Sequence, residues 1–178
     1  MALALTLLSV FTVVGLVLSA ASGWALSHAL GTNLTAARHI AVAVPTILFS
    51  LFTQSMILFF FIGTGKLLKE AAANRADEAG RLYILSKVRE MKMRTSAIAT
   101  FAPLSVLVAG LLGVTAHTGK TPAWLHLVAG VFALLLHLAA FGKEVFAMSE
   151  TNQLMDEAAT LVPPGPGTAA PGTAADAS

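Results

Sequence analysis

The sequence contains no cysteine and little charge. Without cysteine there are no disulfide bonds, thiolate metal sites or thiol nucleophiles. Only 11% of the 178 residues are charged, whereas an ordinary soluble domain has about 25%. Hydrophobic residues make up 56% of the chain. This composition is typical of a membrane protein.

Charge is completely absent from four long stretches. No Asp, Glu, Lys or Arg occurs within 1–37, 39–65, 95–119 or 121–142. A bilayer core is crossed by about 20 apolar residues in a helix, and the shortest stretch has 22 residues. We therefore predict an all-α membrane protein in which residues 1–160 form an antiparallel four-helix bundle. The spans are expected at about 5–25, 39–63, 96–116 and 123–142.

The first span is expected to be a retained helix. It has no Lys or Arg before it, and its apolar run is longer than the roughly 7–15 residues of a signal-peptide core.

The basic residues predict the orientation. Residues 66–94 contain eight Lys or Arg, whereas the two other connections contain only Arg38 and Lys120. Because basic loops stay in the cytoplasm, we expect the loop 66–94 and both termini to be cytoplasmic, with the chain in the inner (cytoplasmic) membrane. Membrane topology accounts for the basic residues, so the net charge of +2 does not indicate a nucleic-acid partner.

Two further segments lie outside the spans. The sequence "RLYILSKVREMKMR" (81–94) mixes apolar and basic residues. It is either an amphipathic helix on anionic headgroups or a solvated basic loop. Residues 161–178 are rich in Pro, Gly and Ala and carry one charge, which predicts a disordered tail.

Five histidines supply the imidazole groups within or beside the spans, and no Asp, Glu, Lys or Arg lies within a span. His28, His39, His117 and His126 fall at the outer helix ends, and only His137 lies deep. In "HLVAGVFALLLH" (126–137), helical periodicity brings the two imidazoles to one face, about 16 Å apart. No carboxylate is expected inside a span, which argues against a proton-driven pump.

Small and polar residues share the histidine faces. His39 is followed on its face by Ala43, Thr46, Ser50, Thr53 and Gln54. His126 is followed by Ala129, Gly130, Ala133 and His137. Such residues face neighbouring helices in membranes because they permit close backbone approach. The histidines are therefore expected to point into the bundle.

Three ligands suit inward-facing histidines: a b-type haem, a metal ion, or a quinone hydrogen-bonded to a His or to Gln54. His39 and His126 are the expected metal or haem ligands. Gly130 leaves room for a porphyrin, and the wider candidate set adds His28, His117 and His137. In the opposing interpretation, the outer histidines are water-exposed residues at the membrane interface, and His137 is an interhelical hydrogen-bond partner of Ser or Thr. If a ligand is bound, His137 is instead a contact of a haem propionate or of the quinone.

Residues 5–142, with histidine-bearing helices and small-residue faces, resemble small membrane cytochromes b and haem-binding quinone-anchor subunits. A fainter similarity is to four-helix, haem-binding membrane protoporphyrinogen oxidases. The expected function follows from the candidate site: a haem- or quinone-binding electron-transfer subunit beside a larger redox or light-driven complex, without a catalytic domain of its own. The alternative functions are a non-redox accessory or assembly subunit and, third, a small transporter.

Overall fold

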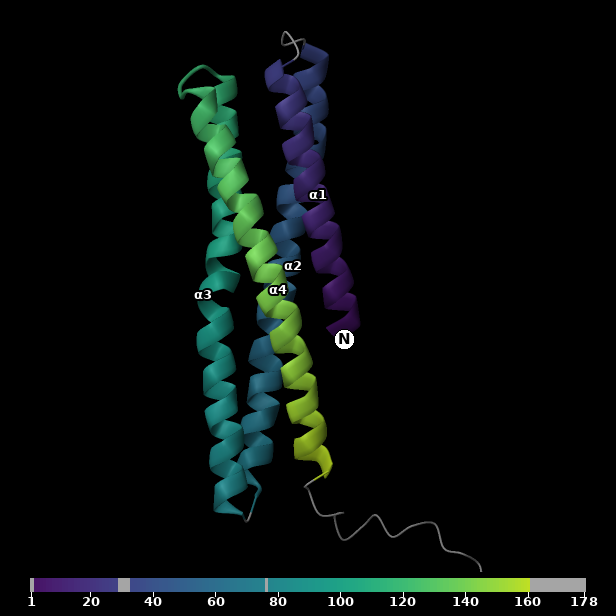
Figure 1. Ribbon diagram of the computed structural model, residues 1–178, viewed down its shortest axis with the longest axis vertical. Helices are drawn as coiled ribbons and strands as arrows, with labels where there is room; N and C mark the ends of the chain where they lie inside the picture. Colours follow the sequence, from purple (N-terminus) through teal and green to yellow (C-terminus); the bar gives the residue numbers. More distant parts are fainter. Residues whose placement is uncertain (1, 29–32, 76, 161–178) are drawn as a thin grey trace, which may run out of the picture.

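The computed structural model describes residues 2–28, 33–75 and 77–160, and within these ranges the chain is helical apart from short connections (Figure 1). The elements are α1 (Ala2–His28), α2 (Asn33–Ala73), α3 (Glu78–His117) and α4 (Ala123–Thr160). Each is long and apolar enough to cross a membrane, and each contains one of the predicted spans. The prediction of an all-α chain with four such helices is confirmed. The predicted disordered tail, 161–178, lies outside the described residues.

Successive helices alternate in direction (Figure 1). In the first pair, Ser22 of α1 contacts His39 of α2, and Thr12 contacts Thr53. Later residues of α1 therefore meet earlier residues of α2. The α2–α3 connection is short because Asp77 caps α3, accepting hydrogen bonds from the backbone N–H groups of Ala79 and Gly80.

The α3–α4 connection follows a C-terminal cap. Gly119 has φ 72°, a conformation that glycine adopts without steric cost. Its N–H donates to Ala116 O, and the N–H of Lys120 donates to Thr115 O. These bonds satisfy carbonyls at the end of α3 and allow α4 to start at Ala123.

The three later helices are much longer than a bilayer requires. They contain 41, 40 and 38 residues, whereas α1 contains 27. At 1.5 Å per residue, 40 residues extend about 60 Å, roughly twice the hydrocarbon thickness. Figure 1 shows α2, α3 and α4 continuing together beyond the start of α1. We call this part, built around Leu68, Val88 and Leu154, the three-helix extension.

The stretch 66–94, expected as a loop, lies mostly within this extension. α2 continues to Ala73 and α3 begins at Glu78. The reason is a buried apolar cluster contributed by all three helices, comprising Leu68, Ala72, Ile84, Val88, Met91, Leu154 and Ala158. Basic residues occupy the remaining faces, so the segment 81–94 is a helix packed on other helices. Neither of the two expectations for it, a headgroup-bound helix or a solvated loop, anticipated this packing.

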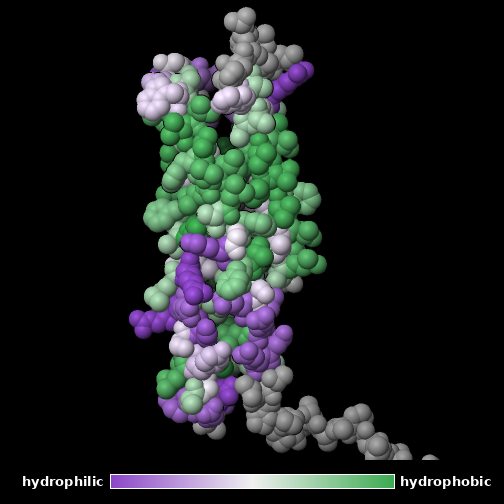
Figure 2. All heavy atoms as spheres, viewed as in Figure 1, coloured by the Kyte–Doolittle hydropathy of each residue, from purple (hydrophilic) through white to green (hydrophobic). Residues whose placement is uncertain are grey.

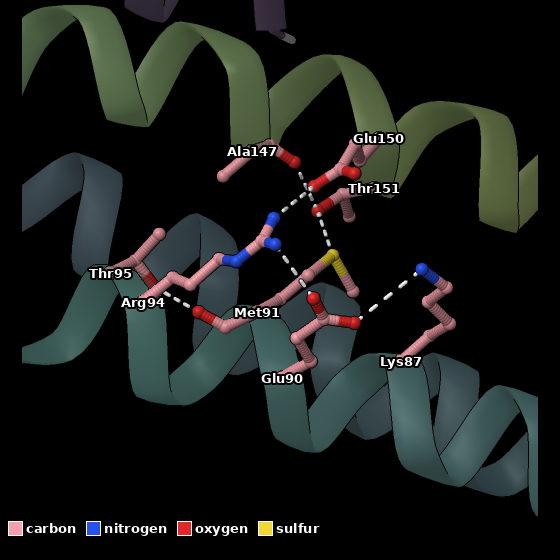
Figure 3. Close-up of polar contacts among 8 residues, drawn as sticks. All are labelled: Lys87, Glu90, Met91, Arg94, Thr95, Ala147, Glu150 and Thr151. Carbon is pink, nitrogen blue, oxygen red and sulfur yellow. Dashed lines mark hydrogen bonds and ion pairs between the residues drawn. The ribbon is translucent and has the colours of Figure 1, made fainter.

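Polar contacts connect α3 with α4 at the upper part of the extension (Figure 3). Arg94 lies 2.8 Å from Glu90 on its own helix and 3.8 Å from Glu150 on α4. The buried hydroxyl of Thr151 contacts both the Ala147 carbonyl and the Met91 sulfur. Exposed ion pairs contribute about 0–1 kcal/mol each, so the apolar cluster provides most of the stability here.

Surface hydropathy divides the molecule into two zones (Figure 2). One end is covered by apolar side chains, and the three-helix extension is predominantly hydrophilic. Large apolar residues are exposed on all four helices, among them Phe11, Phe52, Phe101 and Phe132. Such a continuous apolar surface is consistent with contact with lipid. Trp24 and Trp124 are exposed near the end opposite the extension, the position that tryptophan favours at a membrane interface.

Candidate functional site

Two of the five histidines meet at the end of the bundle away from the extension. His39 of α2 and His126 of α4 have ring centroids 6.0 Å apart and ring planes inclined by 66°. We call them the histidine pair. Both side chains are partly buried. Helices that are not neighbours in sequence thus bring together the two residues that the sequence predicts as metal or haem ligands.

Hydrogen bonds at Nδ1 orient both rings of the pair. Nδ1 of His126 lies 2.9 Å from the carbonyl oxygen of Ala109. A carbonyl only accepts, so this nitrogen carries the proton. Nδ1 of His39 lies 3.0 Å from Ser22 Oγ, whose own hydroxyl donates to Ser19 O. The Ser22 oxygen is therefore placed to accept from His39.

These bonds leave both Nε2 atoms as lone-pair donors. A histidine that ligates a metal commonly donates its other N–H to a carbonyl, a carboxylate or water, which fixes the tautomer and the ring orientation. His126 has this arrangement through the carbonyl of Ala109, and His39 has a serine hydroxyl, that of Ser22, in the same place. Each Nε2 therefore has a lone pair of the kind that metals accept.

Two glycines make room for the rings. A Cβ atom at Gly113 would lie 2.9 Å from Cε1 of His126, and one at Gly23 would lie 3.1 Å from Cε1 of His39. Both distances are shorter than the roughly 3.5–4.0 Å at which carbon atoms pack favourably. The positions of both imidazoles therefore depend on glycine at 23 and 113.

His137 is fully occupied by protein partners. Its side chain is buried, with Nε2 2.8 Å from Ser50 Oγ and Nδ1 3.1 Å from the Ala133 carbonyl. Nδ1 donates to Ala133, so Nε2 accepts from the Ser50 hydroxyl in the neutral ring. This is the interhelical hydrogen bond that the sequence offered as one interpretation of His137, and it leaves no ring nitrogen for a ligand.

Gln54 contacts a carboxylate that the sequence interpretation missed. Its Nε2 donates to Oε2 of Glu144 across 3.3 Å, and both side chains are buried. The predicted fourth span stopped at 142 because Lys143 and Glu144 are charged. Lys143 is exposed, but Glu144 points into the bundle. It lies at the level of Gln54, which is well inside the second predicted span. A carboxylate is therefore buried between the helices two residues beyond the predicted fourth span, which itself contains none. The spacing of seven residues between His137 and Glu144, which places both on one helix face, was the available signal.

Two of the remaining predicted site residues, His117 and Gly130, belong to α3 and α4. His117 is exposed at the end of α3, and the side chain of His28 lies outside the described part of the chain. A Cβ atom at Gly130 would meet nothing within 4 Å, so this position borders open space. Among the described residues, no group of three or more His, Cys, Asp or Glu side chains is arranged to hold a metal ion.

Comparisons of the chain with known protein families, with curated proteins and with solved structures found no match.

Proposed function

We propose that this protein is a membrane subunit that binds a b-type haem between His39 and His126 and transfers electrons within a larger membrane complex. The observation that carries the proposal is the histidine pair: two imidazoles from α2 and α4, 6.0 Å apart, with each Nδ1 held by a protein oxygen. Haem iron accepts imidazole nitrogens as axial ligands.

The two histidine side chains are suitable ligands for haem iron. A metal lies about 2.0–2.1 Å from an imidazole nitrogen, and the two rings, with centroids 6.0 Å apart, could share one ion once their Nε2 atoms face each other. A haem at this site supplies a one-electron carrier. Ser22 and Ala109 set the ring orientations and increase the basicity of each ligand.

Packing limits where the macrocycle fits. Beneath the pair, Leu16, Val106, Ala109 and Ala133 form a closed apolar cluster. The open space is beside Gly130, and Figure 2 shows a notch between the two helix pairs at this end of the molecule. A porphyrin is therefore expected near the membrane surface, with its edge toward that notch.

A quinone is the other redox ligand that the sequence suggests, and the contacts favour it less. Gln54, its expected partner, already donates to Glu144. A shallow groove between α1 and α2 contains the hydroxyls of Thr12 and Thr46, but both donate to other protein oxygens. No described side chain in that groove offers an unused hydrogen-bond donor to a quinone carbonyl.

An absorption spectrum tests the proposal. Protein purified in mild detergent is expected to show a Soret band, and reduction by dithionite is expected to sharpen an alpha band. Protein isolated from haem-supplemented cells without either band, and with no bound metal by elemental analysis, contradicts the proposal.

We also propose that the three-helix extension and both termini are cytoplasmic in an inner-membrane protein. Eight basic residues between 66 and 94 support this orientation, against Arg38 and Lys120 at the other end. The cysteine-free chain allows a direct test with single cysteines at two exposed positions, Thr118 and Ala79. In intact cells, an impermeant thiol reagent is expected to label Thr118→Cys, and Ala79→Cys only after lysis. The opposite pattern reverses the orientation.

A non-redox accessory subunit is the second candidate, and one observation favours it. The hydrophilic three-helix extension exposes large apolar side chains on α3, namely Leu82, Tyr83 and Met93 at 50–64%. Exposed apolar residues on a water-facing surface are typical of a partner contact. This function predicts no Soret absorption, so the same spectrum separates the two.

A further inference from the structure

Glu144 is the one carboxylate buried among the apolar helices in the described part of the chain, and its side chain has no exposed surface. The cluster of Leu5, Ile57, Phe60 and Met148 lies next to it along the bundle. Moving an ionised carboxylate into such surroundings costs several kcal/mol unless a positive charge or several hydrogen bonds compensate. Intramembrane ionisable residues are rare and commonly functional.

Among the side chains that the structure describes, no positive charge compensates Glu144. α1 has no ionisable side chain before His28, and α2 has none between His39 and Lys66. On α3, Arg94 pairs with Glu90 and Glu150. On α4 itself, Lys143 is exposed and points away, and the ring of His137, seven residues earlier, is occupied by Ser50 and Ala133.

The carboxyl group of Glu144 has a hydrogen-bond partner at only one of its two oxygens. The Gln54 amide donates to Oε2 of Glu144, whereas Oε1 of Glu144 and Oε1 of Gln54 are both buried without a partner. An amide oxygen and a carboxylate oxygen only accept, but a protonated carboxyl has one O–H donor. A single proton on Oε1 of Glu144 therefore provides the donor that the two unpartnered oxygens lack. With that proton, the two side chains can form an acid–amide pair that has a second hydrogen bond beside the one from the Gln54 amide.

We propose that Glu144 and Gln54 form a proton-binding site: Glu144 is held as a neutral acid that donates from Oε1 to the Gln54 carbonyl. The site does not depend on haem binding at the histidine pair, which lies 18 residues earlier on α4, about 27 Å along the helix. A metal cation is a poorer occupant. Ca²⁺ takes about 6–8 oxygen ligands and Mg²⁺ an octahedral set, whereas two unpartnered oxygens are present.

Infrared spectroscopy of the protein in lipid nanodiscs tests this site. At neutral pH, the wild-type protein is expected to show the carbonyl stretch of a protonated carboxylic acid. The band should move on exchange into heavy water and on incorporation of isotope-labelled glutamate. The other glutamates of the described residues are partly or fully exposed, so none of them shares the buried apolar surroundings of Glu144.

The matched variants are Glu144→Gln and Glu150→Gln, the same substitution six residues apart on α4. Glutamine retains the shape of the side chain and can pair with Gln54 through two amide hydrogen bonds. We expect Glu144→Gln to fold and to lose the band completely, and Glu150→Gln to retain it. If a buried water bridges the two oxygens instead, Glu144 is ionised and the wild-type band is absent. That outcome overturns the proposal, as does a glutamate band that persists in Glu144→Gln. The wild-type measurement decides the question even if Glu144→Gln fails to fold.

Discussion

Replacement of either His39 or His126 by alanine is expected to abolish the haem alpha band of the purified protein. In the proposed site each residue would supply one nitrogen to the haem iron, and each is held by a separate oxygen, Ser22 Oγ or Ala109 O. Without one of the two side chains, a haem at this site would have a single protein ligand and less packing around it. The measurement is the reduced-minus-oxidised spectrum per mole of protein.

His117→Ala is the matched control. His117 is exposed at the end of α3, so its removal is expected to leave the spectrum within error of the wild type. Persistence of the full alpha band in both His39→Ala and His126→Ala would show that the haem, if present, is bound elsewhere.

A glycine variant tests the same site without removing a ligand. Gly113→Val places a branched side chain where even a Cβ atom would lie 2.9 Å from Cε1 of His126. The ring must move, which breaks its hydrogen bond to Ala109, and the band should weaken strongly. If these histidines are only water-exposed residues at the membrane interface, Gly113→Val should not change the spectrum.

Much of the fold followed from composition. Charge-free stretches of bilayer length identify four helices regardless of how they pack, because lipid imposes a single requirement on every span. The proximity of His39 and His126 was also predictable, since each lies at a helix end of similar depth on a small-residue face. The hydrogen bonding at Nδ1 of the two histidines could not be predicted from the sequence. It depends on Ser22 and on a backbone carbonyl of α3, which no sequence pattern identifies.

Two features were missed because charge was given more weight than periodicity. Leu68 and Ala72 on α2, and Ile84, Val88 and Met91 on α3, recur at spacings of three or four residues within each helix, among the basic residues of 66–94. They form the buried face of the extension. Glu144 was similarly assigned to the end of a span because it adjoins Lys143. The two side chains point in different directions, one toward water and one into the bundle.

The packing of the extension predicts the largest change in stability. Leu68 is completely buried in its cluster, whereas neighbouring Leu67 is 52% exposed. Leu68→Ala leaves a cavity among α2, α3 and α4, and such changes cost about 2–5 kcal/mol. The ion pairs around Glu90 are partly exposed, so they contribute little stability to offset this loss. We therefore expect the extension to open locally while the membrane helices remain packed.

Limited trypsin digestion measures this opening, because Lys66 and Lys69 flank the site. When cleavage follows the population of the open form, a loss of 2 kcal/mol increases the cleavage rate about 30-fold. Leu67→Ala makes the same deletion on the exposed face and should be cleaved at nearly the wild-type rate. The histidine pair is 29 residues from Leu68 along α2, about 43 Å, so Leu68→Ala should leave any haem spectrum unchanged. Equal cleavage of Leu67→Ala and Leu68→Ala would show that the three helices do not pack around Leu68. The apolar periodicity of 66–94 would then serve contact with lipid or with a partner subunit instead.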